Sequence, residues 1–385
     1  MLKISPMKNH ITRRHALALT GAAFATSCVD NKEIFVQTES LPSQDLFGTW
    51  SSGVPLPFPV QEIYPCAHDG AIHLAGGFVA ENGRITGPTN AYNVFTQPDH
   101  DTAHLPTPGS WFRGDSEYLQ NPSHLPAARH HPQMVSFGGQ LLIFAGFESP
   151  SQNAIWTMQS SGWVFSYLLV RIGPAFYWPS SGQFGMPDLP VPCAEAVVGV
   201  TGDNTLHLAG GRTPKGEANA NWNDHIDTDH HFVLTSLDGQ WETAAPCLTK
   251  RNSAAGDVIN GNLHVVGGRA VGGGNVATHE VYDHAEDRWR TAAPMPQAQG
   301  GLAAAAIGNK LYAFGGEFFD NGGGVYKEAW VYDPATDAWS ALPDMPNPRH
   351  GLGAVALDGK IYVIGGALQA SGVDTSNIVD IFTPA

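Results

Sequence analysis

A short apolar phrase that ends in glycine recurs along the chain. Its clearest copy is LYAFGG at residues 311–316, and the other five copies end at Gly77, Phe147, Gly211, Gly268 and Gly366. Each copy is a run of about five mostly apolar residues bounded by a turn signal, which predicts a short, buried β-strand. Successive copies are 70, 64, 57, 48 and 50 residues apart, so the pattern indicates repeated supersecondary units with a minimum period of about 50 residues.

Each repeat continues after its glycines through a loop, a third strand, a tryptophan strand and a proline-rich exit, as in residues 331–350. The spacing from tryptophan to exit is constant at six residues, in Trp241 to Cys247, Trp289 to Met295 and Trp339 to Met345. The last repeat stops before its tryptophan strand, while Trp50 to Leu56 shows the same spacing of six. We therefore expect the N-terminal strand to complete the last unit and to remove an exposed strand edge.

The units together predict an all-β fold, a six-bladed β-propeller of four-stranded blades over residues 48–385. The 42 % hydrophobic content, with 44 Gly and 28 Pro, suits many short strands joined by tight turns. If Trp111 and Trp163 hold the tryptophan-strand position, two repeats carry inserts, around residues 112–124 and 164–186.

The N-terminus has the pattern of an export signal. Residues 1–27 contain basic residues, no acid and an apolar run over 16–25. The two arginines at 13–14 resemble a twin-arginine export signal, and the residues up to Cys28 resemble a lipoprotein processing site at which Cys28 is lipidated. An ordinary signal peptide is the alternative. We expect an exported, periplasm-facing or cell-surface lipoprotein, anchored to the membrane at Cys28, with a tether over 28–47.

The net charge of the chain limits the classes of partner that we expect. The chain has 20 basic and 35 acidic residues, a formal net charge of −15, so nucleic acid is excluded as an expected partner. Besides Cys28 the chain contains only Cys66, Cys193 and Cys247, which permit at most one disulfide.

Arginines recur at equivalent positions of the repeats, where the exits and the loops after the glycines reach one face around the axis. This set, with the exit residue Gln299 of another repeat and with Asn252, which directly follows Arg251, gives candidate ligand-binding residues: Arg129, Arg212, Arg251, Arg269, Arg349, Gln299 and Asn252. Their guanidinium groups suit an anionic small molecule or glycan in an electropositive pocket. The alternative is that the exit arginines hold neighbouring blades together through backbone carbonyls.

Histidines and carboxylates near the same exits are candidates for acid and base chemistry. His130, His131 and His350 belong to the exits, whereas other histidines occupy strand positions. Two positions after the exit position that holds Arg129 and Arg251 lie Glu62, His131, Glu195 and Ser253.

A polar run over residues 223–231 offers Asp224, His225 and Asp227 as weak metal ligands. Their spacing matches no closed zinc or calcium loop, so a solvated loop is favoured and no metal or cofactor is expected. The aromatic residues Phe176, Tyr177 and Trp178 of the second insert predict a partner-facing patch or packed flap, or else a lid over a ligand.

The glycine pairs, the tyrosine or histidine within each strand and the tryptophan strand resemble the kelch superfamily over residues 48–385. Among exported bacterial members the chain resembles the sialic acid mutarotases (N-acetylneuraminate epimerases). That resemblance implies a cofactor-free isomerase whose pocket holds the sugar carboxylate on Arg212 or Arg269, with Glu195 or Glu317 as acid or base. The lipidation signal and the inserts depart from that subfamily, and the copper-binding set of galactose oxidase is not found.

Three functions remain open at this point. The first is an isomerase acting on an acidic sugar, with a uronate polysaccharide lyase as its variant. The second is a surface lipoprotein that binds an anionic glycan without altering it. The third is an interaction scaffold that contacts a protein through the aromatic insert.

Overall fold

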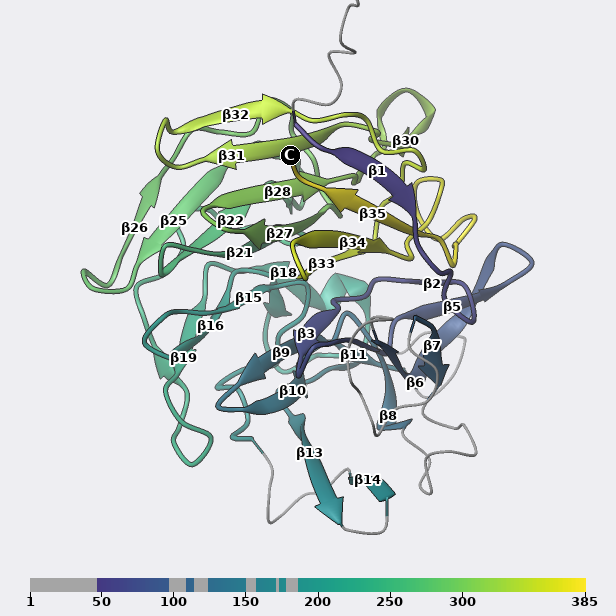
Figure 1. Ribbon diagram of the computed structural model, residues 1–385. Coiled ribbons are helices and arrows are strands. Elements are labelled where there is room, and N and C mark those ends of the chain that lie inside the picture. Colours follow the sequence, from purple (N-terminus) through teal and green to yellow (C-terminus); the bar gives the residue numbers. More distant parts are fainter. Residues whose placement is uncertain (1–46, 97–108, 114–123, 150–156, 171–172, 178–185) are drawn as a thin grey trace, which may run out of the picture. The chain divides into compact units, whose positions relative to one another are not determined.

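The structure is a computed structural model that describes residues 47–96, 109–113, 124–149, 157–170, 173–177 and 186–385 (Figure 1). The predicted export signal, Cys28 and most of the insert predicted at 112–124 lie outside these residues. The described part belongs to one compact unit, Ser43–Ala385. Within it, no helix is long and apolar enough to cross a membrane.

Each recurring apolar phrase forms the second strand of a sheet, as predicted. In the clearest repeat, β28 (Lys310–Phe314) pairs on one side with β27 (Ala303–Ile307) and on the other with β31 (Ala329–Asp333), which pairs with β32 (Ala338–Ala341). Four of the five residues of β28 are buried, because neighbouring blades cover both faces of this strand. Its apolar run is therefore continuous rather than alternating.

Five blades are separate four-stranded antiparallel sheets (Figure 1). The first of them consists of β9 (Gln133–Phe137), β10 (Gln140–Phe144), β13 (Gly162–Val170) and β14 (Gly173–Tyr177). The next consists of β15 (Val197–Val200), β16 (Leu206–Ala209), β19 (His231–Leu234) and β20 (Glu242–Thr243). It is followed by β21 (Ala255–Ile259), β22 (Asn262–Val266), β25 (His279–Asp283) and β26 (Arg288–Thr291), and then by the blade of β27, β28, β31 and β32.

The closing blade joins the two ends of the propeller. It consists of β33 (Gly353–Leu357), β34 (Lys360–Ile364), β35 (Val379–Thr383) and β1 (Thr49–Ser52). Strand β1 pairs antiparallel with β35 and places Trp50 opposite Phe382. The predicted closure of the last blade by the N-terminal strand is confirmed.

The remaining segment differs from the blade that the sequence predicts, because it belongs to a nine-stranded sheet. That sheet contains β2 (Val60–Gln61), β3 (Cys66–His68), β4 (Ala71–Ala75), β5 (Phe78–Glu81), β6 (Arg84–Thr96), β7 (Trp111–Arg113), β8 (His124–His130), β11 (Phe147–Glu148) and β12 (Thr157–Met158). Strand β6 has 13 residues; its end pairs with β4 and β7, while its beginning pairs with β5 and β8. Strands β3, β4, β6 and β7 thus keep blade order, and β3 contacts both β9 and β33.

Among the described residues, five tryptophans join the unit that contains them to the preceding unit. Five indole N–H groups donate hydrogen bonds of 2.8–3.0 Å to backbone carbonyls of a preceding exit; they belong to Trp50, Trp111, Trp241, Trp289 and Trp339. Trp163 is not one of them, because it lies opposite Ile143 on the third strand of its blade. The tryptophan-strand position expected for Trp163 is therefore wrong, and residues 164–177, assigned to an insert, include strands of the blade itself.

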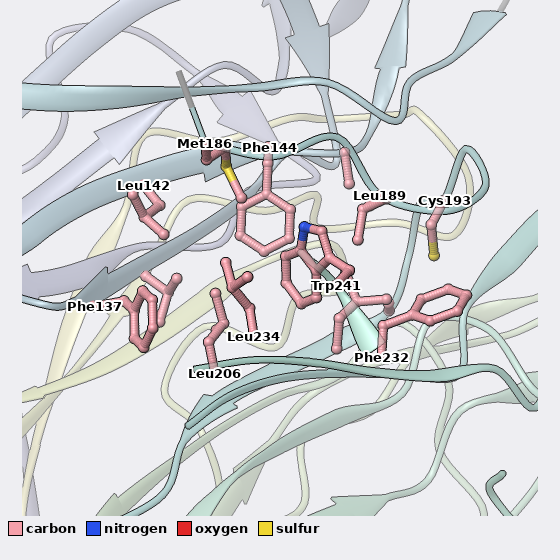
Figure 2. Packing of buried hydrophobic residues seen from close by; sticks show 14 of the residues in the cluster. Phe137, Leu142, Phe144, Met186, Leu189, Cys193, Leu206, Phe232, Leu234 and Trp241 are labelled. Carbon is pink, nitrogen blue, oxygen red and sulfur yellow. The ribbon is translucent and has the colours of Figure 1, made fainter. Parts of the chain in front are cut away.

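Apolar side chains fill the space between neighbouring blades. Figure 2 shows this packing between the blade of β9 and β10 and the blade of β16 and β19, where the indole of Trp241 lies among aliphatic and aromatic side chains. Phe144, Leu206 and Leu234 are fully buried there. At about 25 cal/mol per Å² of apolar surface, such interfaces supply most of the stabilisation of the ring.

Short hairpins follow the glycine pairs and carry several predicted site residues. They are formed by β17 (Arg212–Pro214) with β18 (His225–Asp227), β23 (Arg269–Ala270) with β24 (Gly274–Asn275), and β29 (Glu317–Phe318) with β30 (Gly324–Val325). Two 3-10 helices, η1 (Trp222–Asp224) and η2 (Asp320–Gly322), lie in the loops of the first and third hairpins.

Candidate functional site

Six residues at one repeat position form a ring around the axis. All six adopt positive φ; they are Glu62, His131, Glu195, Ser253, Gly301 and Gly351. In five of the six steps the backbone N–H of one residue donates a hydrogen bond of 2.6–3.2 Å to the carbonyl of a neighbour in the ring. In each repeat, the residue directly before the ring residue pairs with the residue just after a glycine pair. The axial ring therefore lies one position beyond these backbone pairings.

Four of the ring residues are not glycine, although glycine occupies the two other positions. A left-handed conformation costs a residue with a Cβ roughly 1–2 kcal/mol, and Glu62 (φ 56°), His131 (φ 53°) and Glu195 (φ 56°) are not turn formers. Such backbone strain is concentrated at functional positions. The side chains of the axial ring are therefore candidates for a functional role.

These side chains line a cavity of about 380 Å³, which we call the axial cavity. Its polar lining consists of Gln61, Glu62, His131, Glu195, Asn252, Ser253, Arg269, Glu317, His350 and Ser371, and its aromatic lining of Phe78 and Trp222. The structure thus brings Glu195, Glu317, His350, Arg269 and Asn252 together, as predicted for one site. Glu62 and Ser253 were not among the residues assigned a role, although their repeat position equals that of Glu195.

A buried ion pair forms the first part of the site. His131 Nε2 lies 2.7 Å from Glu62 Oε2 and 4.0 Å from Glu195 Oε1. Burial alone would raise the pKa of Glu62, but the charge and hydrogen bond of His131 outweigh burial and lower this pKa to about 2. Burial likewise opposes a charged His131, yet Glu62 and then Glu195 raise its pKa. The cavity therefore holds a carboxylate and an imidazolium side by side.

His130 contacts the ring nitrogen of His131 that does not contact Glu62. His130 Nδ1 lies 2.7 Å from His131 Nδ1, and burial and the charge of His131 lower the pKa of His130 well below its usual range. A charged His131 must donate here, so His130 accepts in its neutral form. The His130 ring stacks between Phe78 and Phe147, at centroid distances of 3.9 and 4.9 Å. His130, a predicted catalytic residue, thus lies behind the cavity lining and acts through His131.

We expect this pair to be visible by NMR titration of the histidine rings. His131 should remain protonated to a higher pH than an exposed histidine, because the Glu62 carboxylate favours its charged form. Replacing Glu62 by Gln should lower the pKa of His131, whereas Glu286→Gln at the exposed surface should not change it. An unchanged His131 titration in Glu62→Gln would contradict the assignment of this ion pair.

A second group of charges faces the first. Arg269 Nη1 lies 2.9 Å from Glu317 Oε1, and Glu317 Oε2 accepts a hydrogen bond from the backbone N–H of Ser371. His350 Nε2 lies 2.6 Å from the Ser371 carbonyl, so Nε2 carries the proton. His350 Nδ1 makes no hydrogen bond within the described part of the chain and lies 3.5 Å from Glu317 Oε1 and 3.9 Å from Glu62 Oε1.

The exit residues predicted to bind a ligand lie inside the blades instead. Arg129 contacts Glu148, Arg251 contacts Glu280, and Arg349 contacts Asp380. Each of the three arginines also donates hydrogen bonds to backbone carbonyls, and none lines the axial cavity. Gln299, at the same repeat position, donates to the Gly315 carbonyl and accepts from the indole of Trp330. These contacts fit the structural alternative for the exit residues.

Arg212 lies next to the axial cavity but is covered. Its guanidinium lies 3.5 Å from the ring centroid of Trp222, and the arginine itself is only 1 % exposed. Arg269 is therefore the only one of the five predicted arginines in the lining. With three glutamates, one arginine and two histidines, the lining does not form the electropositive pocket expected from the sequence.

The three predicted metal-ligand candidates have separate roles. Asp224 caps η1 by accepting the backbone N–H groups of Ala220 and Asn221. His225 bonds to the side chain of Asn219, and Asp227 accepts from Asn252 Nδ2 at 2.7 Å. Among the described residues, no group of three or more His, Cys, Asp or Glu side chains is arranged to hold a metal ion.

Exposed apolar side chains lie on the loops that follow the glycine pairs of four consecutive blades. This apolar rim consists of Trp222, Ile226, Val271, Phe319, Leu368 and Val373, each 39–63 % exposed. Trp222 and Val271 also line the axial cavity. In the second insert, Phe176 and Tyr177 belong to strand β14, whereas Trp178 lies outside the described residues.

The repeats, the closing blade and the axial ring define the molecule as a β-propeller. The description "KLHDC2/KLHL20/DRC7 Kelch-repeats domain" belongs to the family model that matches residues 183–379, just over half of the 385 residues. The chain belongs to this family of kelch-repeat domains, which confirms the kelch resemblance. The match gives no support to the narrower resemblance to sialic acid mutarotases. Comparison with curated proteins finds no match.

Proposed function

We propose that this kelch propeller binds a small carbohydrate in its axial cavity. One observation carries the proposal: the Glu62–His131 pair and the Arg269–Glu317 pair line the same cavity of about 380 Å³. Carboxylates accept hydrogen bonds from sugar hydroxyls, while imidazolium and guanidinium groups donate to sugar oxygens. Phe78 adds an apolar ring to this lining, in the usual combination of apolar walls and few polar groups.

We further propose that the same groups can interconvert the anomers of that sugar. Opening a sugar ring requires removal of a proton from the anomeric hydroxyl and donation of a proton to the ring oxygen. His131 in its charged form is a donor, and the carboxylate of Glu317 or Glu195 is an acceptor. No redox or metal step is part of this proposal.

The acidic sugar expected from the sequence is the narrower version of this proposal. Arg269 supports it, because a guanidinium matches a carboxylate. The three glutamates of the lining and the pairing of Arg269 with Glu317 oppose it, and they oppose a uronate lyase for the same reason. A neutral sugar is therefore favoured, with the acidic sugars as the comparison in the test.

Thermal unfolding of the full chain with neutral hexoses, uronates and sialic acid tests binding. A bound sugar should raise the Tm with concentration, and Glu317→Gln should weaken the affinity by about tenfold, the loss of about 1.4 kcal/mol of charge-assisted hydrogen bonding. Glu286→Gln, on the exposed surface, is the matched control. Absence of a response to every sugar, or an unchanged response in both Glu62→Gln and Glu317→Gln, would reject the proposal. NMR exchange rates between anomers then separate binding from isomerisation.

The apolar rim favours a second candidate, a binding scaffold for a partner protein, since exposed apolar patches are concentrated at interaction sites. A Val271→Ser and Phe319→Ser double variant should lose a partner that wild type and Glu317→Gln both retain in affinity purification. Loss of the partner in Glu317→Gln alone would instead place recognition in the axial cavity.

We also propose export of the chain and lipid anchoring at Cys28, on the sequence of residues 1–28 alone. In a bacterial host, wild type should enter the detergent phase and Cys28→Ala the aqueous phase. Equal partitioning of the two would contradict anchoring.

A further inference from the structure

The axial cavity contains more carboxylates than positively charged side chains. Its charged lining consists of three carboxylates, one imidazolium and one guanidinium, those of Glu62, Glu195, Glu317, His131 and Arg269. His131 pairs with Glu62 at 2.7 Å, and Arg269 pairs with Glu317 at 2.9 Å. Among the described residues, no cation lies closer to Glu195 than His131 Nε2, at 4.0 Å. The lining therefore has an excess of one negative charge.

The neighbouring groups do not balance this charge. Arg212 is only 1 % exposed, and it lies opposite Asp227 in the β17–β18 hairpin, so these two charges offset each other. His350 Nδ1 lies 3.5 Å from Glu317 Oε1 and 3.9 Å from Glu62 Oε1, farther than the about 2.7–3.2 Å of an N–H···O hydrogen bond. A protonated Nδ1 would donate to one of these oxygens, so the imidazole of His350 is neutral.

One carboxylate oxygen of the lining is open to a ligand. Glu62 Oε1 accepts no hydrogen bond from the described residues, and the Glu62 side chain is 19 % exposed. The ring position beside it is Gly351, where a Cβ would lie 2.8 Å from Glu62 Oε1. Because glycine has no Cβ, the axial ring leaves this oxygen uncovered. The cavity wall thus offers a charged acceptor that has no donor.

We propose that the ligand of the axial cavity is an amino sugar with a free, positively charged amino group, and that this group donates a hydrogen bond to Glu62 Oε1. The inference rests on the proposed sugar site and names the class of its ligand. With the ammonium bound, three cations face three carboxylates, and an uncompensated buried charge is removed. Arg269, whose side chain is 22 % exposed, can then donate to a sugar hydroxyl.

The same charges disfavour the related sugars. The hydroxyl of a hexose can donate to Glu62, but a hydrogen bond between two charged groups is stronger, and the hydroxyl leaves the excess negative charge in place. An N-acetylated amino sugar has an uncharged amide at this position. A uronate adds a further carboxylate to the three that are present, and like charges repel.

Calorimetric titration of the full chain with matched sugars tests the inference. The probes are glucosamine, galactosamine and mannosamine, each compared with its hexose and with its N-acetyl derivative. Titration at pH 7.0 keeps the amino group charged, since an α-amino group has a pKa of about 7.7–8.0. We expect at least one amino sugar to bind at least tenfold more tightly than both of its uncharged counterparts.

Variants of the lining locate the preference. Glu62→Gln removes the open carboxylate, so the amino sugar should retain a preference of no more than about twofold over its hexose. Glu195→Gln removes the excess charge without changing the Glu62–His131 pair, and it should also reduce the preference. Glu286→Gln, at the exposed surface, is the matched control and should keep the preference of wild type. Unfolding curves show that each variant is folded.

The pH dependence separates the charge of the amino group from its shape. At pH 9 the amino group is neutral, so the amino sugar and its hexose should bind with similar affinity. The hexose, titrated at the same pH, controls for the titration of His131 and of the other groups of the protein.

The outcomes distinguish this inference from the proposed function. If a hexose or an N-acetyl derivative binds as tightly as its amino sugar, the ammonium contact is overturned and the proposed sugar site stands. A preference that persists in both Glu62→Gln and Glu195→Gln, or at pH 9, likewise overturns the contact. Absence of binding by every sugar rejects the proposed function, and this inference with it.

Discussion

Acidification is expected to unfold the protein between about pH 6.5 and pH 4, because two pairs of buried histidines are neutral in the folded state. His207 Nδ1 lies 3.0 Å from His231 Nε2, and His264 Nδ1 lies 2.9 Å from His279 Nε2. Burial, followed by the paired ring, lowers the pKa of His207 and of His264 to about 3. Burial also lowers the pKa of His231 and of His279 to about 4.

The direction follows from the proton balance. An unfolded chain takes up protons on these imidazoles below pH 6.5, whereas the folded chain does not, so stability is complete above pH 6.5 and falls toward the folded pKa values. At pH 5 the loss is about 2 kcal/mol for each histidine. Four such losses approach the net stability of about 5–15 kcal/mol of an ordinary domain. His131 acts oppositely, because its raised pKa stabilises the folded state below pH 6.5.

A neighbouring blade suggests the variant that tests this account. By register, the positions of His264 and His279 are held by Tyr312 and Ala329 in the next blade. Between pH 7.5 and pH 5, a His264→Tyr and His279→Ala double variant should lose about 4 kcal/mol less stability than wild type, about 2 kcal/mol for each histidine removed, in urea unfolding followed by circular dichroism. His124→Asn is the control at a partly exposed histidine. A double variant as acid-sensitive as wild type would assign the acid unfolding to other groups.

The fold could be predicted to the extent that its signals are local. Apolar strand phrases, glycine turns and the six-residue tryptophan spacing each lie within one repeat, and the structure confirms the second strands and the closing blade. The nine-stranded sheet could not be predicted in the same way, because the 13 residues of β6 pair with four other strands. Trp163 was placed wrongly for a related reason: one tryptophan in a repeat does not say whether it belongs to the third or the fourth strand.

Part of the candidate site could be predicted, again because its signals lie within single repeats. Glu195, Glu317, Arg269 and His350 could be placed on one face by counting within the repeats. The acidic partners of the exit arginines could also have been found, because Glu280 and Asp380 share one repeat position on the third strand of the next blade. The left-handed ring has no such signal, since residues other than glycine are uncommon in that conformation and a glutamate or histidine in a sequence does not mark it.

Arg349→Met is expected to destabilise the protein by about 3–5 kcal/mol, because it leaves a buried carboxylate without its partner. Arg349 and Asp380 are 0 % and 1 % exposed, and Arg349 Nη1 lies 2.6 Å from Asp380 Oδ2. The arginine also donates to the carbonyls of Gly365, Val363 and Asn347. Urea unfolding at pH 7.5 measures the loss. Lys327→Met, which breaks an exposed pair with Asp344, should cost less than about 1 kcal/mol.

Adding Asp380→Asn to Arg349→Met separates the charge from the carbonyl contacts. The double variant should regain more than half of the lost stability, since an amide at 380 needs no counter-ion and still accepts from Asn347. The remaining loss then measures the carbonyls that Arg349 satisfies. If Arg349→Met cost less than about 1 kcal/mol, this arginine would not be structural, and the ligand-binding role expected from the sequence would return. If Arg349 is structural, Arg349→Met should have the sugar affinity of wild type under conditions in which the variant is folded. Arg269→Gln should weaken the sugar affinity, because Arg269 alone of the five predicted arginines lines the axial cavity.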